Sequence, residues 1–252
     1  MHALLLALPG IKTQLFSLIR DLEEERQETV IGSWCLLTHD IESQVSLTVL
    51  PSWEDNFGPG VNPGAEGTLL IRETAPALIS FIRQTIFDPL GAYSVVNPIQ
   101  PSIDTKPTKK GAKPQPRIQG PPEPPSADEE PETERKARVR AGGLGSAKYI
   151  LGMFSQLFPQ LPISHLDGAA RNLLQLSESS REAVDETLSS PLLWTSLHCE
   201  KQSPSDDSEC FGFEQPIVRR AAWGLLFSVL QERKGKSDRT IGVITTLTDC
   251  YR

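Results

Sequence analysis

The residues that could do acid–base chemistry are few, and one pair of them is His39 followed directly by Asp40. A carboxylate beside an imidazole can orient it as a general base. Adjacent side chains on a helix, however, point to different sides of it. A polar turn between two helices accounts for both residues, so we expect no catalytic residue here. A standalone enzyme that depends on His39 or His198 remains a separate hypothesis.

A second group of reactive side chains lies further along the chain, where His198 and Cys199 are followed by Cys210. A structural zinc site needs four ligands, and no fourth ligand follows at short spacing. The remaining cysteines, Cys35 and Cys250, are distant, and no Cys-x-x-Cys pair is present. These spacings argue against a zinc site and a disulfide framework. We therefore expect no metal-binding or cofactor-binding residue in this chain.

Glycine and tryptophan mark two further kinds of candidate position. The run Arg140–Gly145 is rich in glycine, but it lacks the Lys-Ser/Thr ending of a phosphate-binding loop and does not follow a strand. We expect it to be the flexible start of a helix. The tryptophans lie among apolar residues in helical segments, which predicts core anchors first and interface residues second: Trp34, Trp53, Trp194 and Trp223.

The composition is that of a folded protein with no general attraction for phosphate. The chain has 252 residues, 38% of them hydrophobic, and a net charge of −7, so RNA contact would require a local basic patch. The apolar run Ala3–Leu8 is too short for a signal peptide and has no basic residue before it. No stretch has the roughly 18 apolar residues of a membrane span. We expect a soluble, cytosolic protein without a membrane partner.

Residues 97–133 separate two helical segments. They contain ten of the 21 prolines among charged and small residues, which predicts a disordered linker between an N-terminal segment, 1–96, and a C-terminal segment, 134–252. Lysines come first in this linker, followed by an acidic run and a second basic cluster. One interpretation is a solvated spacer. The other is a basic strip that contacts ribosomal RNA or another acidic surface.

Helical spacing of apolar residues dominates the N-terminal segment. It predicts helices over 11–22, 29–38 and 41–53. Asp40 is expected to cap the third helix, and Pro51 to kink or shorten it. A long helix bent near Pro76 is predicted to follow and to end at Phe87.

The C-terminal segment also lacks a convincing strand, despite Val243 and Ile244 among threonines. The predicted helices cover 134–159, 167–176, 180–188 and 191–199, with a surface loop over 200–209. The fold class is therefore all-α.

The last predicted helix has the most distinctive pattern. It begins at Pro216, a residue that the first helical turn tolerates. Two arginines, Arg219 and Arg220, are placed to reach nearby carbonyls or acids. The residues expected to form its buried stripe are Val218, Ala221, Ala222, Leu225, Leu226 and Val229. This Pro-x-Val-Arg-x-Ala arrangement is typical of the second helix of a HEAT repeat. Residues 191–199 would supply the first helix of a HEAT-like unit over 191–233. The pair 29–38 and 41–53 repeats this arrangement, so we expect a HEAT/armadillo-like solenoid segment.

Three stretches, taken in order, resemble the N-terminal region of listerin, a RING-type E3 ubiquitin ligase of ribosome-associated quality control. The matching motifs occur in most of the chain outside the linker: Ile31-Gly-Ser-Trp-Cys-Leu with His39-Asp40 and Trp53-Glu-Asp-Asn-Phe57; Leu192-Leu-Trp194; and Gln215-Pro-Ile-Val-Arg-Arg-Ala-Ala-Trp223 with Thr245-Thr-Leu-Thr-Asp-Cys-Tyr251.

The resemblance implies a scaffold that places the ligase on stalled large ribosomal subunits together with the ribosome quality control complex. In that family, the zinc, the E2 enzyme and ubiquitin are engaged through a C-terminal RING. Four scattered cysteines cannot form its zinc sites, so we expect a fragment that is not catalytic alone. The alternative is a HEAT or armadillo adaptor that joins proteins in another pathway.

Overall fold

The computed structural model describes residues 9–58, 61–62, 65–89, 131–158, 168–198, 210–213 and 215–232. Within these ranges the chain forms helices and turns and no strand, which confirms the all-α prediction. The elements are α2 (Pro9–Arg20), α3 (Glu24–Thr38), α4 (Ser43–Phe57), α5 (Glu66–Phe87), α7 (Glu132–Leu157), α8 (Gly168–Leu188), α9 (Pro191–Trp194), η1 (Thr195–Leu197) and α10 (Pro216–Glu232).

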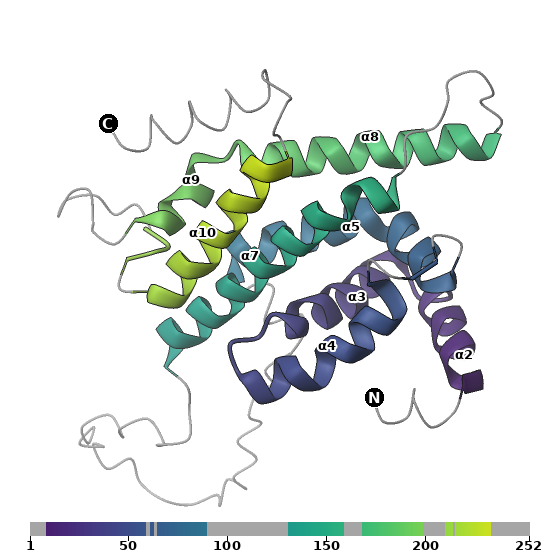
Figure 1. The fold of residues 1–252 in the computed structure, drawn as a ribbon, viewed down its shortest axis with the longest axis horizontal. Helices are drawn as coiled ribbons and strands as arrows, with labels where there is room; N and C mark the ends of the chain where they lie inside the picture. The colour runs from purple at the N-terminus through teal and green to yellow at the C-terminus, as the bar shows by residue number, and fades with distance from the viewer. Residues whose placement is uncertain are drawn as a thin grey trace, which may run out of the picture.

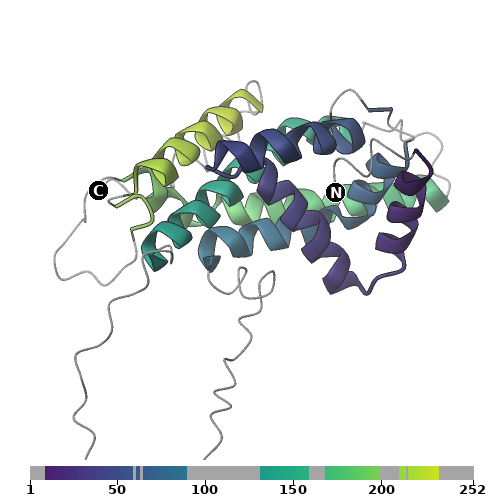
Figure 2. The ribbon, with the colours of Figure 1, turned by 90° about the horizontal axis from the view of Figure 1, so that it is seen from below.

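Helices α5 and α7 lie side by side at the centre, and the other helices pack around them (Figure 1). Helix α8 packs on α5, α10 packs on α7, and α3 contacts both central helices. Helix α4 forms a hairpin with α3, and α2 packs at the far end of α5. Helices α4 and α10 lie along the same side of the molecule (Figure 2).

One hydrophobic core includes residues from both sides of 97–133. It contains Trp53 and Ile71 from the N-terminal segment and Leu144, Trp194 and Leu225 from the C-terminal segment. Burial of large side chains from remote parts of a chain is the main source of folding free energy. The two predicted segments therefore fold against each other.

Two buried or half-buried arginines join the same two segments through backbone carbonyls. Arg72 Nε on α5 donates to the Leu157 carbonyl at 2.7 Å. Arg140 Nε on α7 donates to the Ile86 carbonyl at 2.8 Å. Both carbonyls are in the last turn of a helix, where they lack an intrahelical donor, so each arginine satisfies a helix end while joining α5 to α7.

The N-terminal helices follow their predicted positions, with one difference at Pro51. Helix α4 continues through this proline to Phe57, so the predicted shortening is wrong. The Pro51 side chain is exposed, whereas Trp53 and Phe57 beyond it are buried. The free energy gained by burying these side chains in the last turn thus exceeds the cost of the backbone hydrogen bond that proline removes from the helix. Pro76 likewise lies inside α5.

Three predictions for the C-terminal helices need correction. The helices predicted over 167–176 and 180–188 are replaced by one helix, α8, over Gly168–Leu188, because no proline or glycine separates residues 176 and 180. The helix predicted over 191–199 is a single α-turn followed by a 3₁₀ turn that ends at Leu197. Thr195 explains this early end, since its carbonyl accepts from both His198 N–H and Gly212 N–H instead of continuing an α-helix.

Helix α7 begins at Glu132, inside the stretch predicted as a linker. Residues 91–130, the loop over 200–209, and Val243 with Ile244 lie outside the described residues. Among the helices described, none combines the length and apolar character that crossing a bilayer requires.

Candidate functional site

The adjacent residues His39 and Asp40 serve different contacts. Asp40 Oδ1 accepts from the Glu42 backbone N–H at 2.8 Å, and its Oδ2 lies 3.5 Å from Arg138 Nη1 of α7. This carboxylate thus shapes the turn before α4, although its side chain does not cap the helix itself. The His39 ring instead packs beside Tyr149, with centroids 5.9 Å apart. No general-base geometry links the two residues.

Burial keeps the His39 imidazole neutral. It lowers the pKa of His39 to about 4, and the nearby Lys148 ammonium lowers it further in the same direction. Burial also raises the pKa of Tyr149 to about 12. Both groups are therefore uncharged near neutral pH, as expected for side chains at a packed contact between α3 and α7.

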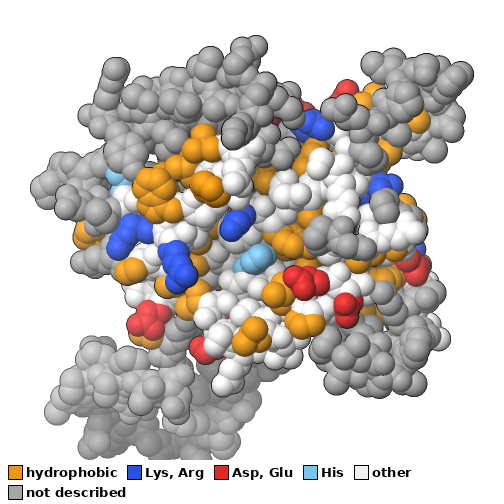
Figure 3. All heavy atoms as spheres, viewed as in Figure 1, with side chains coloured by type: hydrophobic (Ala, Val, Ile, Leu, Met, Phe, Trp, Pro, Cys, Tyr) orange, Lys and Arg blue, Asp and Glu red, His pale blue; other side chains and the backbone are white. Residues whose placement is uncertain are grey.

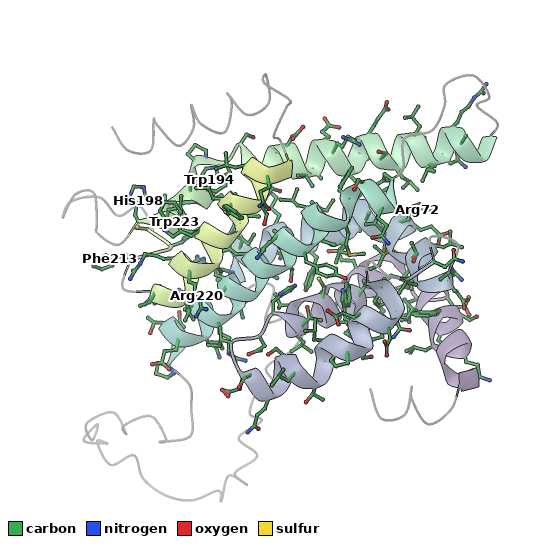
Figure 4. The ribbon with its side chains drawn as sticks, in the orientation of Figure 1. Arg72, Trp194, His198, Phe213, Arg220 and Trp223 are labelled. Carbon is green, nitrogen blue, oxygen red and sulfur yellow. The ribbon has the colours of Figure 1, made fainter. Side chains whose placement is uncertain are left out.

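The second reactive group does not form a metal site in the described part of the chain. Cys210 Sγ donates to the Thr195 carbonyl at 3.4 Å, and His198 is half-buried at the end of η1 (Figure 4). Cys199 lies outside the described residues. Among those described, no three His, Cys, Asp or Glu residues are grouped as metal ligands would be.

The glycine-rich run lies in the middle of α7 and is a packing surface, so its prediction as a flexible helix start is wrong. A Cβ on Gly143 would overlap Thr85 Oγ1 and lie 3.0 Å from Ile86 Cγ1. A Cβ on Gly145 would lie 2.9 Å from the His39 side chain. The missing side chains allow α7 to approach α3 and α5 closely.

Three of the four tryptophans are the buried anchors that the sequence predicts. Trp34, Trp53 and Trp194 are no more than 8% exposed, and Trp194 Nε1 donates to the Leu188 carbonyl at 2.9 Å. Trp223 is 55% exposed, so its assignment to the core is wrong. It lies on the outer side of α10 (Figure 4).

Five of the six residues predicted for the buried stripe of α10 are buried: Val218, Ala222, Leu225, Leu226 and Val229. The sixth, Ala221, is half-buried. The two arginines of the motif differ. Arg219 Nη1 donates to the Gly212 carbonyl at 2.6 Å, which matches the expected contact with an inter-helix turn. Arg220 is exposed and lies on the outer side of the helix near Trp223 (Figure 4).

An apolar groove lies between α3 and α4. Its volume is about 300 Å³, and its lining is mainly apolar: Val30, Ser33, Trp34, Leu37, Thr48, Val49 and Ser52. Two of these side chains remain substantially in solvent, Val30 at 38% and Leu37 at 40% exposed. Trp34 supplies the aromatic part of this lining, and its ring packs against that of Trp53 with centroids 6.1 Å apart. Such a concave apolar surface is suited to the side chains of a protein partner.

A second apolar surface lies on α10, which we call the outer α10 face: Trp223, Phe227 and Leu230. These side chains are 55%, 62% and 39% exposed. Figure 3 shows hydrophobic side chains gathered in this region with Lys and Arg side chains beside them. The signal for this face is in the sequence, where the three residues recur at spacings of four and three alongside the buried stripe.

The groove was not predicted because it depends on how two helices, α3 and α4, pack in space.

Comparisons with protein-family models, curated proteins and solved structures find no match for this chain.

Proposed function

We propose that this chain is a helical-repeat scaffold that binds the large ribosomal subunit as the N-terminal arm of a listerin-like ubiquitin ligase. Its contribution is placement of the ligase beside the ribosome quality control complex in the cytosol. Ubiquitin transfer, E2 binding and zinc coordination belong to the RING of that family. The proposal rests on the ordered motifs of the sequence together with the surfaces that the helices leave exposed.

The observation that carries the proposal is the apolar groove between α3 and α4. A domain that acts alone buries such side chains, whereas a scaffold leaves them for a neighbour or a partner. Leu37 and Val30 are partly exposed at the groove, and Trp34 beside them is buried. A partner that inserts apolar side chains there removes this surface from water without disturbing the core.

The HEAT assignment is a finer part of the same proposal and is supported by α10. This helix starts at Pro216 and packs on η1 and α7. Arg219 bonds the turn before it, through the Gly212 carbonyl. In repeat proteins, an antiparallel helix pair buries one face within its own unit and presents the other to a neighbour. The short α9–η1 segment would be the first helix of the unit.

A second candidate function is an adaptor that joins proteins in another pathway, and the surface charge of α8 favours it. Glu178, Glu182, Asp185 and Glu186 lie together around Arg181 on this helix. Together with the net charge of −7, this acidic surface is unfavourable for contact with ribosomal RNA phosphates. Negative charge on α8 does not disfavour a protein partner that contacts the apolar groove through uncharged side chains.

Co-sedimentation of the 252-residue chain with purified large ribosomal subunits tests the leading proposal. The chain is expected to pellet with the subunits. Leu37→Glu places a charge in the groove and is expected to weaken binding about tenfold, because that charge loses water when a partner enters. The matched control is Leu174→Glu on α8, whose parent side chain is 43% exposed, close to the 40% of Leu37.

The control is expected to bind as the unsubstituted chain does. Absence of the unsubstituted chain from the pellet would contradict ribosome binding and leave the adaptor as the better hypothesis. Equal loss in both variants would show that the groove is not the contact surface.

A further inference from the structure

Helix α10 is apolar on two sides, and the core accounts for only one of them. Val218, Leu225 and Val229 face α7 and are at most 1% exposed. Phe227 is the most exposed residue of the outer α10 face, at 62%. A helix with apolar residues on both sides is suited to burial between two neighbours. The described residues supply one neighbour.

The 20 residues that follow α10, 233–252, lie outside the described residues, but their sequence has a clear pattern. Gly235 is suited to end a helix, and Ser237 or Asp238 to cap the next one. Apolar residues then recur at spacings that place them on one side of a helix: Val243, Ile244, Leu247, Cys250 and Tyr251. The pattern predicts a short amphipathic helix after a turn of hairpin length.

The spacings of the two apolar faces match when the helices run in opposite directions. Along α10, the exposed residues are separated by four positions and then by three. Taken backward from Tyr251, the segment has the same order, four and then three. In an antiparallel hairpin, contacts run forward along one helix and backward along the other. The matching pairs are Trp223 with Tyr251, Phe227 with Leu247, and Leu230 with Ile244.

We propose that residues 240–251 form a helix that packs antiparallel on the outer α10 face. Only residues 233–239 separate the segment from the end of α10, so a short turn can bring it back along the same helix without spanning the rest of the molecule. The contact buries two aromatic side chains of α10 against apolar residues of matching spacing. This inference concerns a different surface from the α3–α4 groove and does not depend on ribosome binding.

Disulfide trapping in the full chain tests the proposal with a cysteine that the segment already contains. Trp223→Cys places a thiol on α10 opposite the Cys250–Tyr251 end of the segment. Cys250 belongs to the apolar side of the segment and is one position from Tyr251, so the packed hairpin brings its thiol close to position 223. Cys199→Ser and Cys210→Ser remove two further thiols, and Cys35 is fully buried. After mild copper-catalysed oxidation, we expect an intramolecular link from position 223 to Cys250, identified by mass spectrometry of non-reduced peptides.

Gln231→Cys in the same background is the matched control. Gln231 is also exposed on α10, but it lies near the start of the proposed hairpin, about 12 Å along the helix from position 223. For an unattached tail, the shorter loop makes the Gln231 position link to Cys250 about twofold faster. The packed helix reverses this order, so that the Trp223 position links faster.

Two outcomes overturn the proposal. Faster or equal linking from the Gln231 position shows that the segment does not lie along α10. Linking of position 223 to Cys250 of another molecule, seen as a covalent dimer, shows that a second copy covers the outer α10 face. Trp223 is largely exposed, so its replacement leaves the core intact and the measurement interpretable.

Discussion

The α3–α4 hairpin and α10 both leave apolar side chains in solvent, but the two surfaces have different shapes. The first is a groove of about 300 Å³ between two helices. The second is the convex side of one helix, with Trp223 at 55% exposed. A groove accepts individual side chains, whereas a helix face is covered by another helix lying along it.

Exposed apolar area alone therefore does not identify a binding site. The outer α10 face has a segment of matching spacing that follows it directly in the same chain. The groove is instead lined by side chains of two helices that already pack against each other. We therefore propose the groove as the surface for a partner and the outer α10 face as a surface covered by the chain itself.

Helix α7 supports both surfaces, so a substitution that separates it from its neighbours is expected to have the largest effect. Gly143→Leu would force a side chain into Thr85 and Ile86 of α5, and we expect a loss of about 3 kcal/mol in the free energy of unfolding. A Cβ on Gly152 of the same helix meets nothing within 4 Å, so Gly152→Leu is expected to be neutral or stabilising by about 0.5 kcal/mol.

Urea unfolding followed by circular dichroism and tryptophan fluorescence measures both variants. If the two regions form one cooperative unit, the two probes shift together in Gly143→Leu. Separate transitions would show that the α3–α4 hairpin and α10 unfold independently and belong to two domains.

A change in pH is expected to act through the α3–α4 end, because His39 lies in the turn that joins the two helices. Its folded-state pKa of about 4 is below the usual value near 6.5. The unfolded chain therefore binds the proton more readily between these values. His39 thus stabilises the fold above pH 6.5, and this stability is lost as the pH falls toward 4.

Between pH 7 and pH 5, we expect His39 to lower the free energy of unfolding by about 2 kcal/mol. Urea unfolding at each pH measures the slope. His39→Gln keeps a polar side chain that does not titrate, and its stability is expected to be nearly constant over the same range. An unchanged slope in this variant would assign the pH dependence to other groups.

The regular helices could be predicted from sequence because their apolar spacing and their packing agree. The stripe of α10 and the burial of Trp34 and Trp53 follow from this agreement. The glycines of α7 were predicted to weaken the helix because glycine has a low helix propensity. The close packing that Gly143 allows depends on Thr85, which is distant in sequence.

Trp223 was assigned to the core for a related reason. Its helix is apolar on both sides, and periodicity does not tell which side meets the rest of the chain. The groove was equally inaccessible to sequence analysis, since its lining combines side chains of two helices, α3 and α4, whose packing distance the sequence does not give.

The smallest expected effect is also the sharpest test of the difference between the two surfaces. A double-mutant cycle of Trp223→Ala and Tyr251→Ala measures whether these residues interact, and we expect a coupling of about 0.5–1 kcal/mol in urea unfolding. Trp223→Ala with Val30→Ala at the groove is the control pair, because these residues belong to different surfaces and should add without coupling. Coupling only in the first pair would mean that α10 is covered by its own chain. Additive effects in both pairs would make the outer α10 face as open as the groove, and the two surfaces would then be equal candidates for a partner.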